Sequence, residues 1–148
     1  MEIEVKIKEL THEDLVNFLS TVFYGSTTFV PVRYDEYKPL ENLGEGDCYE
    51  DKMANVLLNG GRVGAIDLEY DDELYKNEGV LAVVNEEGDA EYRFDLKAVK
   101  KGLKKALESN DYSLRLAVFN MLVDDGSFDA ADAELLIQMI IFGEVIYG

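Results

Sequence analysis

The chain has 148 residues, with 31 Asp and Glu against 14 Lys and Arg, which gives a formal net charge of −17. Nine Tyr, seven Phe and a hydrophobic fraction of 47% exclude an acidic disordered segment, because such segments are poor in aromatic and aliphatic residues. The length fits a single domain over residues 1–148, and the acidity predicts no direct binding to nucleic acid or to anionic membranes.

The first half of the sequence predicts one strand, two helices and a long connection. Apolar and charged residues alternate over 3–7, which is typical of a half-buried strand. Thr11 stands three residues before Asp14, a capping-box pattern, and the helix that it begins ends near Gly25. No clear period runs through 25–46, although 29–34 could form a short strand.

The second half predicts the rest of an α+β fold. A helix opens at Asp47 and ends at Asn59-Gly60-Gly61. The further predicted elements are strands over 63–70, 80–84 and 90–94, with a hairpin turn at 85–88, and helices over 96–108, over 111–123 and after Asp129. We therefore expect a small, mainly antiparallel sheet of about four strands packed against about five helices.

One cysteine and one histidine leave little material for a catalytic or metal site. Cys48 cannot form an intramolecular disulfide and fits a reducing cytosol. His12 lies 36 residues from Cys48, so nothing supports a Cys–His nucleophile, and a zinc site normally needs about four such ligands. The segment 124–129 resembles half of a calcium loop, but Met121 and Val123 occupy the positions of the first ligands. No catalytic residue, cofactor or metal is predicted.

The sequence shows no targeting signal that we recognise, and it predicts a soluble cytoplasmic protein. The start of the chain, Met1-Glu2-Ile3-Glu4, is no secretory signal. The longest strongly apolar tract, 137–142, is too short to span a bilayer. The helix over 135–142 is apolar around most of its surface, so it is either a buried central helix or half of a homodimer interface.

The acidic residues are densest in the predicted sheet. Residues 61–95 hold 11 acids and 3 bases, a net charge of −8 in 35 residues. Strand alternation predicts that Ile66, Leu68 and Tyr70 face the core while Asp67, Glu69 and Asp71 face water. The same alternation turns Tyr92 and Phe94 inward, and Asp89, Glu91 and Asp95 outward. Carboxylates two residues apart on a strand are roughly 6.6–6.8 Å apart, close to the separation of successive phosphates in nucleic acid.

Such rows are either a plain solvated face or a surface that presents phosphate-like charge to a basic partner. The candidate partner-binding residues are Asp67, Glu69, Asp71, Asp72, Glu73, Glu86, Glu87, Asp89 and Glu91, with Tyr34 and Tyr37 as secondary candidates. The two tyrosines lie in the long connection, where they either anchor a partner or pin the loop to the core.

Five lysines follow helical spacing in the helix after Asp95 and share one face: Lys97, Lys100, Lys101, Lys104 and Lys105. They are either an exposed face partly paired with nearby acids or a face that binds phosphate or membrane.

Two stretches carry a resemblance to small acidic proteins of phages and conjugative elements of gut bacteria. The first is 46–54 with 57–61, and the second is 131–142 with 144–148. This resemblance implies a setting in which inhibitors of host defence, including antirestriction and anti-CRISPR proteins, are common. It supplies no catalytic motif.

The first functional hypothesis is therefore a non-enzymatic, anti-CRISPR type of inhibitor that occupies the basic nucleic-acid channel of a CRISPR effector nuclease. The alternatives are an acidic adaptor or assembly protein of a mobile element and, less favoured, a carboxylate-based enzyme.

Overall fold

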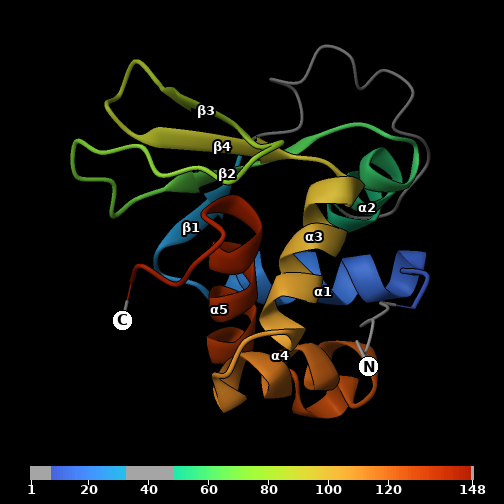
Figure 1. Cartoon of the computed structure of the whole chain (residues 1–148). Helices are drawn as coiled ribbons and strands as arrows, with labels where there is room; N and C mark the ends of the chain where they lie inside the picture. Colours follow the sequence, from blue (N-terminus) through green and yellow to red (C-terminus); the bar gives the residue numbers. More distant parts are fainter. Residues whose placement is uncertain (1–7, 33–48, 148) are drawn as a thin grey trace.

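The computed structural model describes residues 8–32 and 49–147, so the strand predicted over 3–7, the predicted helix start at Asp47, and Tyr34 and Tyr37 lie outside the described residues. The described residues form five α-helices and one four-stranded antiparallel sheet, which confirms the predicted α+β fold. The elements in chain order are α1 (His12–Gly25), β1 (Phe29–Pro31), α2 (Tyr49–Leu58), β2 (Val63–Asp67), β3 (Leu81–Val84), β4 (Ala90–Phe94), α3 (Leu96–Leu107), α4 (Tyr112–Leu122), η3 (Asp125–Ser127, a 3-10 turn) and α5 (Ala130–Ile141) (Figure 1).

The sheet has the strand order β1-β2-β4-β3, and all neighbouring strands are antiparallel. At its centre Val63 pairs with Phe94, and Ala65 pairs with Tyr92. These four side chains are almost completely buried on the face that meets the helices. The inward orientation predicted for Tyr92 and Phe94 is therefore confirmed, and β3 is left at one edge of the sheet.

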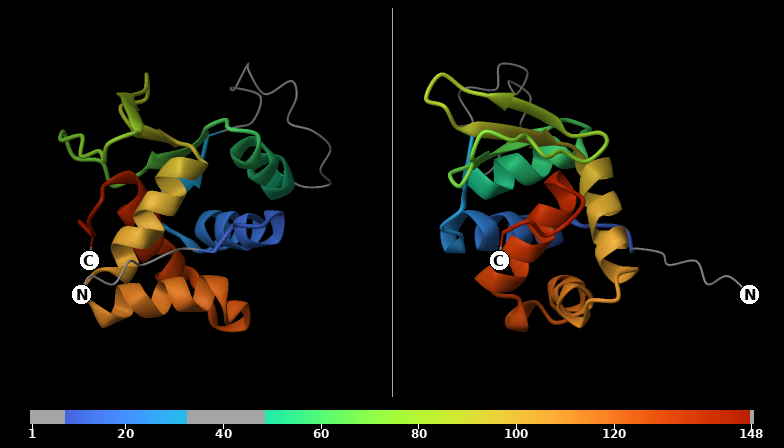
Figure 2. Two further views of the ribbon diagram at one scale, coloured as in Figure 1. Left: turned by 45° about the vertical axis from the view of Figure 1, so that its right-hand side comes forward. Right: turned by 60° about the vertical axis from the view of Figure 1, so that its left-hand side comes forward.

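Helix α5 is the central element of the core. Its buried residues include Leu136, Ile137, Ile140 and Ile141, and it packs against α1, α3 and α4. The first interpretation of the C-terminal apolar helix, a buried central helix, is thus confirmed. A dimer formed through Ile140 and Ile141 would need an apolar face that the protein's own helices already cover. Figure 2 shows α4 at the end of the molecule opposite the sheet.

Side-chain caps explain where the helices begin. The Thr11 hydroxyl accepts the Asp14 N–H at 3.1 Å, and the Asp14 carboxylate accepts the Thr11 N–H at 2.9 Å, so the predicted capping box is confirmed. Asp95 accepts the Ala98 N–H at 2.9 Å and caps α3. Asp95 therefore belongs to a helix terminus and not to a row of strand carboxylates.

Gly102 allows α3 and α5 to approach closely. A Cβ atom added there would lie 2.7 Å from the Cα and 2.9 Å from the backbone nitrogen of Ile140. We expect Gly102→Ala to lower the free energy of unfolding by about 1–3 kcal/mol through overpacking, although alanine is the better helix former by about 1 kcal/mol. Urea denaturation checks this, with Lys101→Ala on the exposed side of the same helix as the control. Equal stability of the two variants would contradict it.

Candidate binding surface at one end of the sheet

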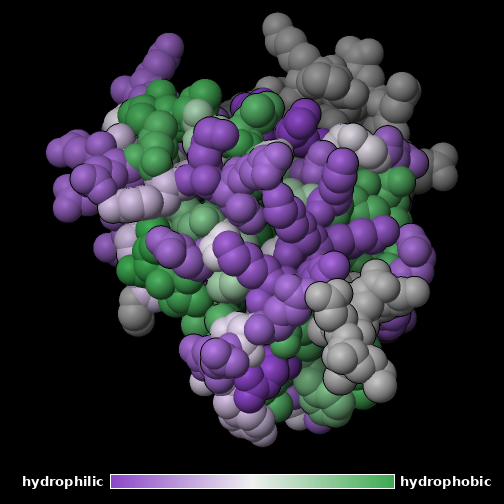
Figure 3. Space-filling view, viewed as in Figure 1, coloured by the Kyte–Doolittle hydropathy of each residue, from purple (hydrophilic) through white to green (hydrophobic). Residues whose placement is uncertain are grey.

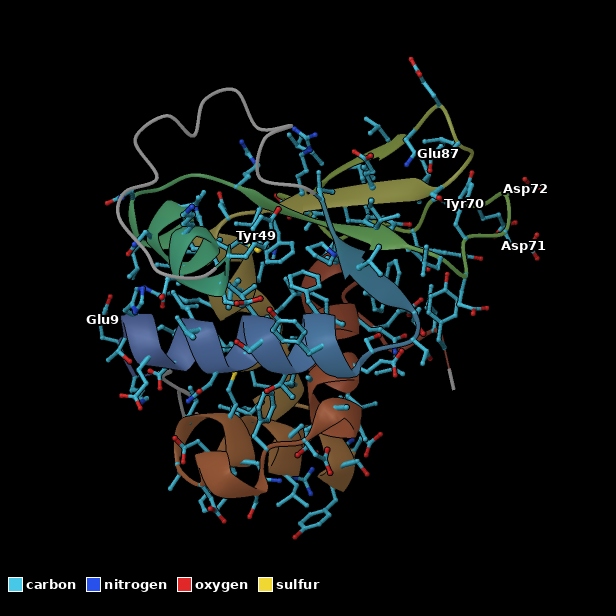
Figure 4. The ribbon with its side chains drawn as sticks, turned by 180° about the vertical axis from the view of Figure 1, so that it is seen from behind. Glu9, Tyr49, Tyr70, Asp71, Asp72 and Glu87 are labelled. Carbon is cyan, nitrogen blue, oxygen red and sulfur yellow. The ribbon has the colours of Figure 1, made fainter. Side chains whose placement is uncertain are left out.

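The register of the strands brings two acidic segments to one end of the sheet. Asp67 of β2 pairs with Ala90 of β4, and Ala90 pairs with Val84 of β3. The loop that follows β2 and the turn that joins β3 to β4 therefore leave from the same end, as Asp72 and Glu87 show in Figure 4. We call the following residues the acidic end: Glu69, Asp71, Asp72, Glu73, Glu86, Glu87 and Asp89. All are exposed except Asp89, which is half-buried.

Asn85 fixes the backbone of the turn, and the predicted hairpin is confirmed. Its side-chain oxygen accepts the N–H of Glu87 at 3.0 Å and the N–H of Asp89 at 2.9 Å. Gly88 has a φ of 87°, a conformation in which glycine is unstrained. The side-chain nitrogen of Asn85 also donates to the Glu91 carboxylate at 3.2 Å. These hydrogen bonds give the backbone that bears the carboxylates of the turn a defined conformation.

A cleft of about 430 Å³ lies between the β2–β3 loop and the segment that follows α5. The described residues that line it include four carboxylates and no Lys or Arg: Glu69, Asp71, Glu73, Tyr75, Glu144, Ile146 and Tyr147. The Tyr75 hydroxyl donates to Glu73, and this bond raises the pKa of Tyr75. The cleft is therefore shaped and charged for a cationic group.

Asp67 does not face water, contrary to the alternation predicted from the sequence. Its side chain is 0% exposed, whereas Leu68, predicted to be buried, is 48% exposed. The reason is that β2 ends at Asp67, whose carboxylate accepts the N–H of Glu69 at 2.9 Å and turns the chain. The inward set of β2 is Val63, Ala65 and Asp67.

Asp67 instead forms a hydrogen-bonded pair with Tyr147, in which the aspartate is buried and the tyrosine is half-buried. The Tyr147 hydroxyl donates to the Asp67 carboxylate at 2.5 Å. Burial raises the pKa of Asp67, although the bonds from Tyr147 and from the Glu69 N–H oppose that rise. Burial and the bond to Asp67 raise the pKa of Tyr147. Asp67 is thus buried, whereas Tyr147 lines the cleft.

Gln138 places Tyr147 in that position. Its side-chain oxygen accepts the N–H groups of Ile146 at 2.9 Å and of Tyr147 at 2.8 Å, and it is 1% exposed. Gly143, with a φ of 78°, reverses the chain just after α5. Tyr75, Glu144 and Tyr147 are not among the binding residues predicted from the sequence. The signal that could have indicated a docked C-terminal segment is Gln138, the one polar residue in the apolar stretch 135–142.

The phosphate-like rows of carboxylates are not formed. Glu69 and Asp71 lie in a loop after β2 and not in a strand, so the regular spacing of a strand does not apply to them. Glu91 lies in β4, but its side chain is only 13% exposed and its nearest oxygen is 3.7 Å from an Arg93 nitrogen. The acidic end is thus a cluster on two loops, with Glu91 at its margin.

The raised pKa values of two tyrosines predict a sensitivity to alkali. Burial raises the pKa of Tyr92 to about 12, and the pKa of Tyr147 also rises above its ordinary value near 10. The pKa of each tyrosine is higher in the folded state than in the unfolded state. The contribution of the two protonated tyrosines to stability is therefore fully present below about pH 10, and it is lost as the pH rises through the folded-state pKa values. We expect the urea midpoint to fall between about pH 10 and 12, and to fall less in Tyr147→Phe. A flat profile would contradict the assignment.

The lysine face of α3 is an exposed face partly paired with acids, the first of its two interpretations. Lys100 lies 3.2 Å from Glu9, and Lys101 lies 3.4 Å from Glu78. Lys104 lies 4.0 Å from Glu108. Figure 3 shows hydrophilic side chains over the face that carries α3.

The described residues contain no group of three or more His, Cys, Asp or Glu side chains that could hold a metal ion. The nearest polar contact of His12 is with the Asp51 carbonyl oxygen at 3.4 Å, which links α1 to α2. Cys48 lies outside the described residues.

The comparisons with known proteins returned no relative: no family model matches the chain, and neither the curated proteins nor the solved structures gave a significant match. Over the described residues, no helix has the length and apolar character needed to cross a membrane.

Proposed function

We propose that the protein is a non-catalytic acidic inhibitor that inserts its acidic end into a Lys- and Arg-lined groove of a nucleic-acid-binding protein. The observation that supports this most is the convergence of two acidic segments, the β2–β3 loop and the β3–β4 turn, at one end of the sheet. Acidic residues on two projecting loops can enter a groove, whereas a flat sheet face cannot.

The charge of the acidic end has no close cation in the part of the chain that the structure describes. Among the described residues, no Lys or Arg lies within 4.0 Å of a carboxylate of the acidic end, whereas three lysines of α3 pair with Glu9, Glu78 and Glu108. Carboxylates held close together without cations gain free energy when a partner supplies Lys and Arg and counterions are released.

The target class that we favour is the nucleic-acid channel of a host defence nuclease, with a CRISPR effector as the first example. Such channels hold a heteroduplex or a displaced strand through its backbone, so they present cations to anything that follows the same path. The resemblance to proteins of mobile elements supports this choice over other basic grooves. Tyr34 and Tyr37 stay secondary contact candidates.

A binding and cleavage panel tests the proposal. Guide-loaded CRISPR effectors and restriction endonucleases are each mixed with the protein, and complex formation and DNA cleavage are measured at low and high salt. We expect at least one nuclease to be bound and inhibited, with an affinity that falls steeply as salt rises. Binding that does not change with salt, or no binding to any basic-groove protein, would overturn the proposal.

A further inference from the structure

The edge strand β3 is open and apolar. In the part of the chain that the structure describes, no strand pairs with β3 on the side away from β4. Leu81, Val83 and Val84 are 51%, 53% and 46% exposed, and the strand contains no charge, Pro or Gly. Figure 3 shows hydrophobic side chains gathered over β3. Proteins normally protect such edges with charges, prolines or bulges, so an unprotected edge indicates a partner strand.

The hairpin identifies which backbone groups face the open side. The N–H of Asn85 donates to the carbonyl of Asp89 at 2.8 Å. Hydrogen-bonded and non-hydrogen-bonded pairs alternate along an antiparallel ladder, so the next hydrogen-bonded pairs are Val83 with Glu91 and Leu81 with Arg93. The N–H and C=O groups of Ala82 and Val84 therefore point toward the open edge.

The charges at the two ends of β3 are opposite in sign. The acidic turn with Glu86 and Glu87 follows the strand. Gly79, just before the strand, lines a depression of about 280 Å³ with the cations Arg62, Lys97 and Lys101 and the carboxylates Glu78 and Asp95. The two carboxylates are already engaged, because Glu78 pairs with Lys101 and Asp95 caps α3. This depression can therefore accept an acidic group.

We propose that β3 pairs with β3 of a second copy of this chain, antiparallel about a two-fold axis at Val83. Ala82 then forms hydrogen bonds with Val84 of the second copy, and Val83 faces Val83 of the second copy in a non-hydrogen-bonded pair. This register places Glu87 of one copy beside Gly79 of the other, next to Lys97. A symmetric contact of this kind joins both sheets and leaves the cleft acids of the β2–β3 loop exposed.

A cysteine scan tests the register directly. In a Cys48→Ser background, which removes the single native thiol, Val83→Cys and Leu81→Cys are each oxidised mildly. Facing Val83 residues have Cα atoms about 4.5 Å apart, within disulfide range, whereas the two Leu81 sites are about 13 Å apart and cannot be bridged. We expect Val83→Cys to form covalent dimers at least about tenfold faster. Equal rates, or no dimers from either variant, would overturn the proposed pairing.

A charge exchange tests whether the strand that pairs with β3 belongs to a second copy of this chain. In sedimentation experiments we expect a concentration-dependent dimer that is weakened by Glu87→Lys or by Lys97→Glu alone and is restored in the double variant. A monomer at every concentration, or a double variant weaker than both single variants, would contradict the proposal. Glu87 belongs to the acidic end, whereas Lys97→Glu and the cysteine variants leave every residue of that end in place, so these variants distinguish failure here from failure of the proposed function.

Discussion

Reversing three charges in the cleft is expected to lower the affinity for a basic-groove partner at least about 100-fold. The variant is Glu69→Lys, Asp71→Lys and Glu73→Lys, and all three side chains line the cleft between the β2–β3 loop and the C-terminal segment. Each substitution replaces an attraction to the partner's cations with a repulsion. The dissociation constant at several salt concentrations measures the effect, and the salt dependence of the variant should be flatter.

A matched variant separates local charge from total charge. Glu13→Lys, Glu108→Lys and Asp125→Lys change the net charge by the same amount at exposed positions outside the acidic end. We expect this control to bind within about a few-fold of the parent. If it loses as much affinity as the cleft variant, total charge and not the acidic end determines binding.

Removing the Tyr147 hydroxyl is expected to lower the free energy of unfolding by about 1–3 kcal/mol. Tyr147→Phe keeps the ring contacts with Phe29 and Phe142, whose centroids lie 6.4 Å and 5.8 Å from that of Tyr147, but leaves the buried Asp67 carboxylate without this donor. In an Asp67→Asn background the same change should cost clearly less, because no buried charge is left unpaired. Urea denaturation of the four proteins measures the coupling, and additive effects would contradict the pair.

The pH dependence of Asp67 has a definite sign. Burial raises the folded-state pKa of this carboxyl above its unfolded value near 3.9, so the folded protein holds the proton more tightly. The contribution of Asp67 to stability is therefore fully present below about pH 4 and is lost as the pH rises through the raised folded-state value. We expect the stability of the parent relative to Asp67→Asn to fall over that interval. A relative stability that rises with pH would contradict the assignment.

Local chemistry made most of the fold predictable. Thr11, Asp95 and Asp129 each cap a helix through the next backbone N–H groups, and these caps lie in the chain next to the segments that they order. The strand over 90–94 was also predicted with its correct bounds, since it follows a turn and alternates clearly.

The orientation of β2 could not be predicted in the same way. Apolar and acidic residues alternate from Ile66 to Tyr70, and this pattern does not show that the strand stops at Asp67. The second carboxylate oxygen of Asp67 is satisfied by the hydrogen bond from Tyr147, 80 residues later in the chain, which no local pattern indicates. The cleft was missed for the same reason, because one of its walls is the C-terminal segment that Gln138 holds.

Displacement of nucleic acid tests the central claim most directly. A target nuclease is loaded with a fluorescently labelled nucleic acid, and the protein, its cleft variant and its matched control are titrated against the complex. We expect the parent and the control to release the label competitively, and the cleft variant to release little. Binding of the parent without release of the label, or equal release by all three proteins, would contradict the account.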